Sequence, residues 1–146
     1  MRAPTPVKAL DAVDLACDES GRWKGAAVFV YEVDGWTVFE DLSGNLGALL
    51  PSRWLALAEK DDLIFAGYND AIRYGELVVI QNGMVVRAFL DDEHDSSARR
   101  DEGRLPQEHS GPLKTWIDVA SLVDDDPILR QAPQQGLLWI HASPCQ

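Results

Sequence analysis

The chain is poor in positive charge. It has 13 Lys and Arg residues against 24 Asp and Glu residues, which gives a formal net charge of −11 over 146 residues. Because affinity for a phosphate backbone comes mainly from Lys and Arg, this shortage argues against a nucleic-acid-binding protein. It also argues against binding to an anionic membrane surface. The charge instead suits a protein partner with a basic surface, although acidic charge can also serve solubility alone.

Cysteine and long apolar runs are also scarce. The two cysteines, Cys17 and Cys145, lie near opposite ends of the chain and lack the C-x-x-C spacing of a zinc or redox site. We expect two unbridged thiols in a reducing cytosol, with a bridge between them as the alternative. No apolar run reaches the ~18 residues that a membrane span needs, and Asp11 and Asp14 fall where a signal peptide would be apolar. These features predict a cytoplasmic protein.

Motifs of catalysis and of metal or nucleotide binding are missing. The chain has no G-x-S-x-G and no EF-hand pattern, and its nearest approach to a glycine-rich phosphate loop, residues 43–47, contains no lysine. The pairs Glu40-Asp41 and Asp91-Asp92 could serve acid–base chemistry, but 24 acids in 146 residues make neighbouring pairs common by chance. We therefore predict no catalytic residue, no dedicated metal site and no cofactor.

The strongest structural signal lies in residues 76–92, with the sequence ELVVIQNGMVVRAFLDD. Two runs of strand-forming residues flank Asn82-Gly83, a dipeptide that accepts the positive φ angles of a type I′ turn. The pattern predicts a β-hairpin whose second strand leads into an acidic cluster, residues 91–95. Another hairpin is predicted over residues 25–42, with Asp34-Gly35 as its turn.

Prolines at first helical positions predict three helices, over residues 6–16, 51–60 and 112–126. The last has an apolar stripe from Leu113 to Val123, and Pro127 is expected to stop it. Three consecutive aspartates, residues 124–126, stand at its C-terminal end, where the helix dipole disfavours negative charge. That local cost hints that these charges serve another purpose.

A further strand is predicted over residues 63–68, and residues 137–140 are expected to form a last short strand or a segment packed on the core. Asn69-Asp70 is expected to form a turn or bulge, after which residues 71–74 continue extended until Gly75 breaks the strand. The polar stretch 91–111 predicts a long solvated loop, and residues 1–5 and 141–146 are expected to be loose.

Together these elements predict an α+β protein that forms a single globular domain over residues 1–146. The expected architecture is a single antiparallel sheet of five to six strands with two to three helices packed on it. The five tryptophans are spread evenly, which predicts core packing. An exposed aromatic residue beside acids would instead suit a protein interface, and the places to look for one are Tyr68-Asn69-Asp70 and Tyr74, at a strand break.

Four segments carry a resemblance to known proteins: GWTVFEDLSG (residues 35–44), FAGYNDAIRYGELVVIQNG (65–83), VVRAFLDD (85–92) and a W-x-D-V-A helix (116–120). Over about residues 23–124 the chain resembles small acidic α+β immunity proteins of bacterial toxin systems. The resemblance implies a protein that binds a secreted toxin, often one with a basic surface, and blocks it without a catalytic site. It carries over no binding residues, because such interfaces differ between pairs.

The leading hypothesis is a cytoplasmic immunity or inhibitor protein, monomeric or weakly dimeric, that neutralises a toxin through an acidic surface. One alternative is a small-molecule-binding domain or small enzyme with a carboxylate-lined cleft; another is a self-associating protein that uses an apolar sheet face or a free edge. Incidental cation binding by residues 91–95 stays open. The predicted partner-binding residues are acids at strand ends and a tyrosine anchor: Glu40, Asp41, Tyr68, Asp70, Asp91, Asp92, Glu93 and Asp95.

Overall fold

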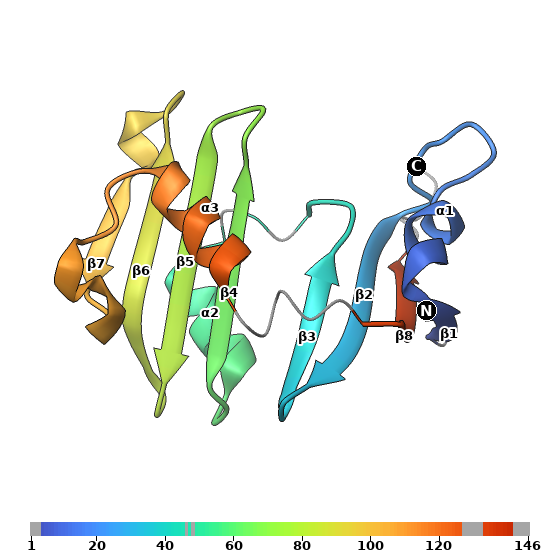
Figure 1. Cartoon of the computed structure of the whole chain (residues 1–146), viewed down its shortest axis with the longest axis horizontal. Helices are drawn as coiled ribbons and strands as arrows, with labels where there is room; N and C mark the ends of the chain where they lie inside the picture. The colour runs from blue at the N-terminus through green and yellow to red at the C-terminus, as the bar shows by residue number, and fades with distance from the viewer. Residues whose placement is uncertain (1–3, 46, 48, 127–132, 142–146) are drawn as a thin grey trace. The chain divides into compact units, whose positions relative to one another are not determined.

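The computed structural model describes residues 4–45, 47, 49–126 and 133–141. The chain divides into two compact units: unit 1 is residues 1–46 with 127–146, and unit 2 is residues 47–126. Each unit contains one four-stranded antiparallel sheet (Figure 1). The predicted α+β class is confirmed, but the predicted single sheet is wrong. The last strand pairs inside unit 1, and the two predicted hairpins lie in different sheets.

The sheet of unit 1 has the order β1-β8-β2-β3. Its hairpin, formed by β2 (Ala26–Val33) and β3 (Trp36–Asp41), confirms the hairpin predicted over residues 25–42. Asp34 and Gly35 have φ angles of 48° and 82°, as a type I′ turn requires. On the other side of β2 lies β8 (Gln135–His141), which includes the predicted strand 137–140.

The predicted helix over residues 6–16 is wrong in its first half. Thr5–Lys8 form β1, which pairs with β8, and only Ala12–Ala16 form the helix α1, after a 3-10 turn at Ala9–Asp11. The reason is tertiary: pairing with β8 overrides the local helical pattern, and a proline is tolerated because β1 is an edge strand. Helix α1 covers one face of the sheet, where Ala16 packs with Ala27 and Leu138.

The sheet of unit 2 has the order β4-β5-β6-β7. Its strands are β4 (Leu63–Asn69), β5 (Tyr74–Gln81), β6 (Met84–Asp92) and β7 (Arg100–Gly103). Asn82 and Gly83 have φ angles of 51° and 74°, so the predicted hairpin and its type I′ turn are confirmed.

The helices α2 (Pro51–Ala58) and α3 (Trp116–Asp125) lie on opposite faces of this sheet (Figure 1). On the α3 face, Val119 packs on Leu77 and Phe89. On the α2 face, the ring of Trp54 stacks on that of Phe65 with centroids 4.5 Å apart. None of the described helices is long and apolar enough to cross a membrane.

Several local predictions fail because a distant contact decides them. Gly75 lies inside β5 and does not break it, and residues 71–73 form a turn. Helix α3 begins at Trp116, not at residue 112. Core packing holds for Trp54, which is 7% exposed, but not for Trp23 or Trp139, which are 42% and 37% exposed.

The predicted long loop over residues 91–111 is also wrong. Asp91 and Asp92 still belong to β6, β7 pairs back onto β6, and 3-10 turns form at Ser96–Ala98 and Pro106–Ser110. At the chain ends predicted to be loose, Thr5 lies in β1 and His141 in β8; residues 1–3 and 142–146 lie outside the described residues, as does Pro127. Cys17 is a half-buried free thiol, whereas Cys145 is not among the described residues.

Gly75 is a point of close approach between α3 and the sheet. A Cβ atom at this position would lie 2.8 Å from the Cα and 2.9 Å from the Cβ of Trp116. Real carbon atoms do not approach so closely, so the first turn of α3 would have to move away. Glycine at this position therefore sets where α3 begins, and with it the position of the residues beside that end of the helix.

We expect Gly75→Ala to lower the free energy of unfolding of unit 2 by about 1–3 kcal/mol, because α3 must shift off the sheet. Amide hydrogen exchange of β5, measured residue by residue, reports this value. Gly67→Ala is the matched control in the neighbouring strand, where a Cβ would meet only a ring carbon of Phe65 at 3.9 Å. Equal effects of the two substitutions would show that the close approach of α3 does not matter.

Candidate partner-binding surface

Asp91, one of the predicted partner-binding acids, is bound inside unit 2. At the end of β6, its Oδ2 accepts a hydrogen bond from the backbone N–H of Trp116 at 2.7 Å, and its Oδ1 accepts one from Nη1 of Arg99 at 3.2 Å. Its side chain is only 13% exposed. A carboxylate at this position satisfies a first-turn amide of α3 and complements the positive end of the helix dipole. Asp91 therefore joins the end of the sheet to α3.

The other acids of the cluster also have partners within unit 2. Glu93 accepts hydrogen bonds from Nη1 of Arg73 at 3.0 Å and from Nε1 of Trp116 at 3.2 Å, and the bond from Arg73 is the main cause that lowers its pKa. Asp92 accepts a bond from the N–H of His94 at 2.9 Å, and Asp95 caps the 3-10 turn at Ser96–Ala98. Among the residues the structure describes, no group of three or more His, Cys, Asp or Glu side chains could hold a metal ion.

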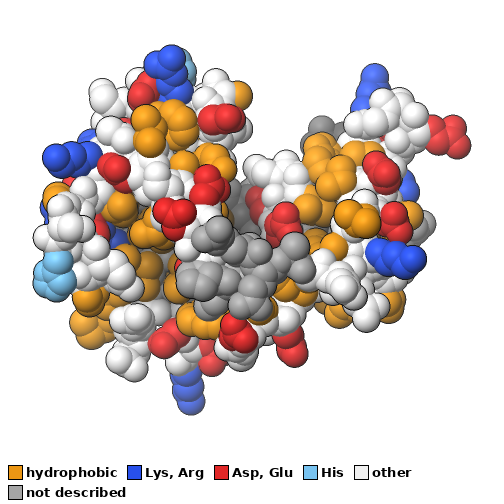
Figure 2. Space-filling view, in the orientation of Figure 1, with side chains coloured by type: hydrophobic (Ala, Val, Ile, Leu, Met, Phe, Trp, Pro, Cys, Tyr) orange, Lys and Arg blue, Asp and Glu red, His pale blue; other side chains and the backbone are white. Residues whose placement is uncertain are grey.

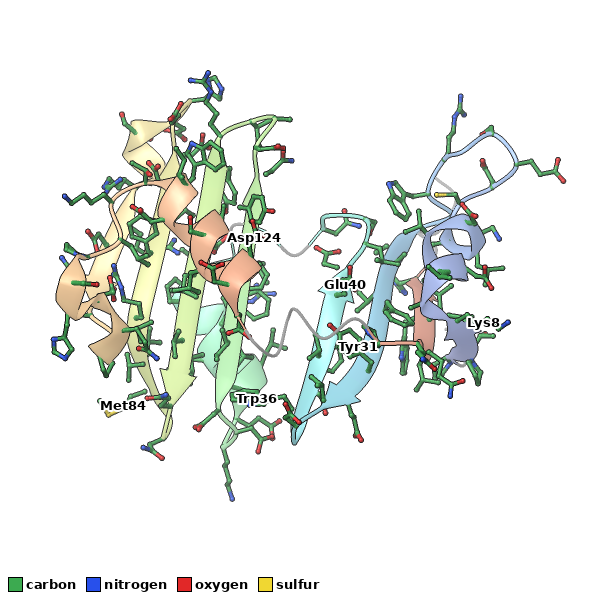
Figure 3. The ribbon with its side chains drawn as sticks, in the orientation of Figure 1. Lys8, Tyr31, Trp36, Glu40, Met84 and Asp124 are labelled. Carbon is green, nitrogen blue, oxygen red and sulfur yellow. The ribbon has the colours of Figure 1, made fainter. Side chains whose placement is uncertain are left out.

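Tyr68 and Asp70 lie at a different part of unit 2, beside the C-terminal end of α3. Oη of Tyr68 donates a hydrogen bond to Oδ1 of Asp124 at 3.1 Å, and both acids, Asp70 and Asp124, are exposed. Asp124 is labelled on α3 in Figure 3. The hydrogen bond to Asp124 raises the pKa of Tyr68, as do the charges of Asp124 and Asp70, so the phenol stays neutral. We call these three residues the Tyr68 patch. Asp124 was not among the predicted site residues, although its unfavourable place at a helix C-terminus was a signal for it.

The remaining predicted acids, Glu40 and Asp41, end β3 and belong to unit 1. Glu40 is exposed, whereas Asp41 accepts a hydrogen bond from the N–H of Gly44 at 3.1 Å. The surrounding sequence contains no Lys or Arg from residue 25 to residue 52. The predicted site residues thus fall into three groups: a network at the start of α3, the Tyr68 patch, and an acidic hairpin in unit 1.

Two shallow hollows lie elsewhere on the described surface. One, of about 550 Å³, has Glu108 as its only lining acid, and the other, of about 320 Å³, has Glu32. Both oxygens of Glu108 already accept hydrogen bonds, from Arg87 and from the backbone N–H groups of Leu105 and Leu113.

Arg87 is the buried charge of unit 2. Its side chain is fully buried in β6 and donates to both oxygens of Glu108 at 3.0 Å, to Oδ1 of Asp101 at 2.8 Å and to the carbonyl of Glu102 at 2.9 Å. Burial raises the pKa of Asp101 and of Glu108, but hydrogen bonds and charge outweigh it, so both pKa values lie below their ordinary values. At Asp101 these opposing effects come chiefly from Arg87; at Glu108 they come first from two backbone N–H groups and then from Arg87. The cluster is therefore structural and pairs the buried charge of Arg87 with two carboxylates, of which that of Glu108 is itself buried.

We expect Asp91→Ala to lower the free energy of unfolding of unit 2 by about 1–3 kcal/mol, because it leaves the N–H of Trp116 without its acceptor. Amide hydrogen exchange of β5 and β6 measures the loss. Asp125→Ala removes the same charge at the other, exposed end of α3 and is expected to be neutral or slightly stabilising, since it relieves the helix dipole. Equal losses would mean that charge alone, not the bond to the helix, accounts for the effect.

Acid is expected to destabilise unit 2 through Asp101 and Glu108. Folding lowers the pKa values of these two carboxyl groups. Their contribution to the free energy of unfolding is therefore complete above their unfolded pKa values of about 3.9 and 4.3, and it is lost as pH falls through the lower pKa values of the folded state. Urea midpoints should stay level from about pH 7 to about pH 5 and fall below about pH 4.5.

The variant Glu108→Gln is the test of that assignment. It should be less stable than the parent at neutral pH, because Arg87 loses a charged partner, and its urea midpoint should fall less steeply in acid. A parent and variant with the same acid slope would exclude Glu108 as a source of the pH dependence.

In comparisons with known proteins, no family model, no curated protein and no solved structure matches this chain.

Proposed function

We propose that this protein is an inhibitor of the immunity-protein kind, which binds a basic protein toxin through an acidic surface and blocks it. The observation that carries the proposal is the Tyr68 patch. It presents a tyrosine that is 39% exposed, with its hydroxyl held by Asp124 and with Asp70 beside it. Tyrosine is among the residues that anchor protein interfaces, and acids around it favour a partner of opposite charge.

The distribution of ion pairs supports an acidic surface of this kind. Four arginines, Arg73, Arg87, Arg99 and Arg104, pair with four carboxylates of unit 2: Asp91, Glu93, Asp101 and Glu108. These eight groups cancel one another, so the net charge of −11 belongs to the rest of the chain. Among the ion pairs of the described residues, none includes Asp70 or Asp124. The Tyr68 patch can therefore offer its charge to a partner without breaking an ion pair of its own.

The geometry of the Tyr68 patch also lowers the cost of binding. Its hydrogen bond to Asp124 orients the phenol before a partner arrives, so less side-chain entropy is lost on association. Tyrosine has few rotatable bonds for the contact area it provides. The charges of Asp70 and Asp124 would act mainly on the association rate, which falls as salt screens them.

The test begins with the gene beside this chain's gene, which we expect to encode a toxin-like protein. Co-expression of the chain with that protein should restore growth to cells that the toxin alone arrests. The double variant Asp70→Lys with Asp124→Lys should slow association with the purified, inactivated toxin by tenfold or more at about 50 mM salt and by much less at about 500 mM. Stopped-flow or surface plasmon resonance measures the rates.

The matched control is Glu19→Lys with Glu102→Lys, which makes the same change of charge at two other exposed positions. It should change the association rate by less than the first pair does. An equal effect would show that net charge, not the Tyr68 patch, steers the partner. Failure to protect cells and failure to bind the neighbouring toxin would together refute the proposed function.

A further inference from the structure

β3 forms an open edge of the sheet in unit 1. Within the described part of the chain its only strand neighbour is β2. The N–H of Leu42 donates to the carbonyl of Ala27 at 3.0 Å, and this pair continues the register in which Asp41 lies opposite Val28. Because bonding alternates along an antiparallel pair, every second residue before Leu42 also faces β2. The backbone N–H and C=O groups of Thr37, Phe39 and Asp41 therefore point outward, to the open edge.

The two edges of this sheet differ in their protection against a further strand. β1, at the other edge, contains Pro6, which has no N–H to donate, and Lys8. Proline and lysine are the residues that commonly block pairing at sheet edges. β3, with the sequence WTVFED, has neither of them and pairs with β2 without a bulge. Its edge is thus open to an added strand where that of β1 is closed.

An added strand would also find an apolar neighbour on β3. Phe39 is 64% exposed and lies opposite Val30, which in turn lies opposite Leu137. Because Ala27 and Leu138 face α1 and side chains alternate along a strand, these three residues form an apolar row on the other face of the sheet. Figure 2 shows apolar side chains, in orange, on the visible surface of unit 1. A side chain placed beside Phe39 would extend that row by one strand, and cross-strand pairs of this kind stabilise sheets.

The charge of the hairpin selects a basic strand. The hairpin carries Glu32, Asp34, Glu40 and Asp41 and no Lys or Arg. Glu32 lies opposite Thr37, a small residue, and both line the hollow of about 320 Å³. A Lys or Arg on the added strand opposite Thr37 can therefore extend over it toward the carboxylate of Glu32. The edge strands of the unit 2 sheet are less selective, because Lys60 and Arg73 flank β4 in the sequence and β7 begins with Arg100.

We propose that β3 binds an extended, Lys- or Arg-bearing segment of the partner protein as a fifth, antiparallel strand of the unit 1 sheet. The segment places an apolar side chain beside Phe39 and basic side chains beside Thr37 and Asp41. The proposal takes the basic character of the partner from the proposed function and adds the strand that it pairs with. This mode of recognition gains affinity from backbone hydrogen bonds and specificity from alternate side chains.

The test uses a synthetic peptide as the probe. The capped hexapeptide Lys-Lys-Val-Val-Arg-Thr matches β3 in antiparallel order, with its first residue opposite Asp41 and its last opposite Trp36. Titrated into the full chain, it should shift the amide resonances of residues 37, 39 and 41 and protect those amides from hydrogen exchange. A peptide of the same sequence, N-methylated at its third and fifth residues, keeps the charges but loses two donors that face β3, and should bind at least tenfold more weakly.

Substitutions in the chain complete the experiment. Thr37→Pro removes an outward N–H without touching a bond to β2 and should weaken peptide binding at least tenfold, whereas Thr37→Ala keeps that N–H and should bind within about threefold of the parent. Equal binding of the methylated and unmethylated peptides would overturn the proposal in favour of charge attraction alone. Sedimentation that shows a dimer, abolished by Thr37→Pro, would overturn it in favour of a second copy at this edge. The peptide result is independent of growth protection, so failure here leaves the proposed function testable by itself.

Discussion

The structure of unit 2 depends on one buried arginine. Arg87 has no exposed surface, and a guanidinium without partners in that position would be costly to desolvate. Its partners, Asp101 and Glu108, both come from the polar segment after β6. That segment must therefore fold back onto the sheet, which creates β7 and the 3-10 turn at Pro106–Ser110. Gly103 permits the return, because a Cβ there would lie 2.1 Å from the carbonyl oxygen of Val86.

This constraint divides the acids of the chain into two populations. Acids such as Asp91 and Glu108 accept hydrogen bonds from buried or half-buried donors, and their charge is used inside the protein. Acids such as Asp70 and Asp124 are exposed and belong to no ion pair among the described residues. Substitution of an acid of the first population changes the stability of the fold, whereas substitution of an exposed acid of the second population can test partner recognition. Mapping an interface by charge alone would confuse loss of stability with loss of binding.

Sequence reasoning succeeded where the deciding interaction was local. Asn82-Gly83 and Asp34-Gly35 predicted both hairpins, because turn geometry depends on the turn residues themselves. It failed where a distant partner decides: Arg87 orders the predicted loop, and β8 pairs with residues predicted to be helical. The candidate site shows the same limit. Tyr68 and Asp70 are near neighbours in the sequence, whereas the bond from Tyr68 to Asp124 spans 56 residues, and no local pattern predicts it.

The acids of the unit 1 hairpin bear on which strand could join its open edge. Solubility alone would favour protection at both edges of the sheet, yet only β1 carries proline and lysine. Glu40 and Asp41 oppose a second copy of the chain, because an acidic hairpin brought to its own edge adds like charges. The same two acids attract a strand that bears Lys or Arg. Negative charge at an open edge thus favours a basic partner strand over a second copy of the chain. A lysine at this edge would not favour one over the other in this way.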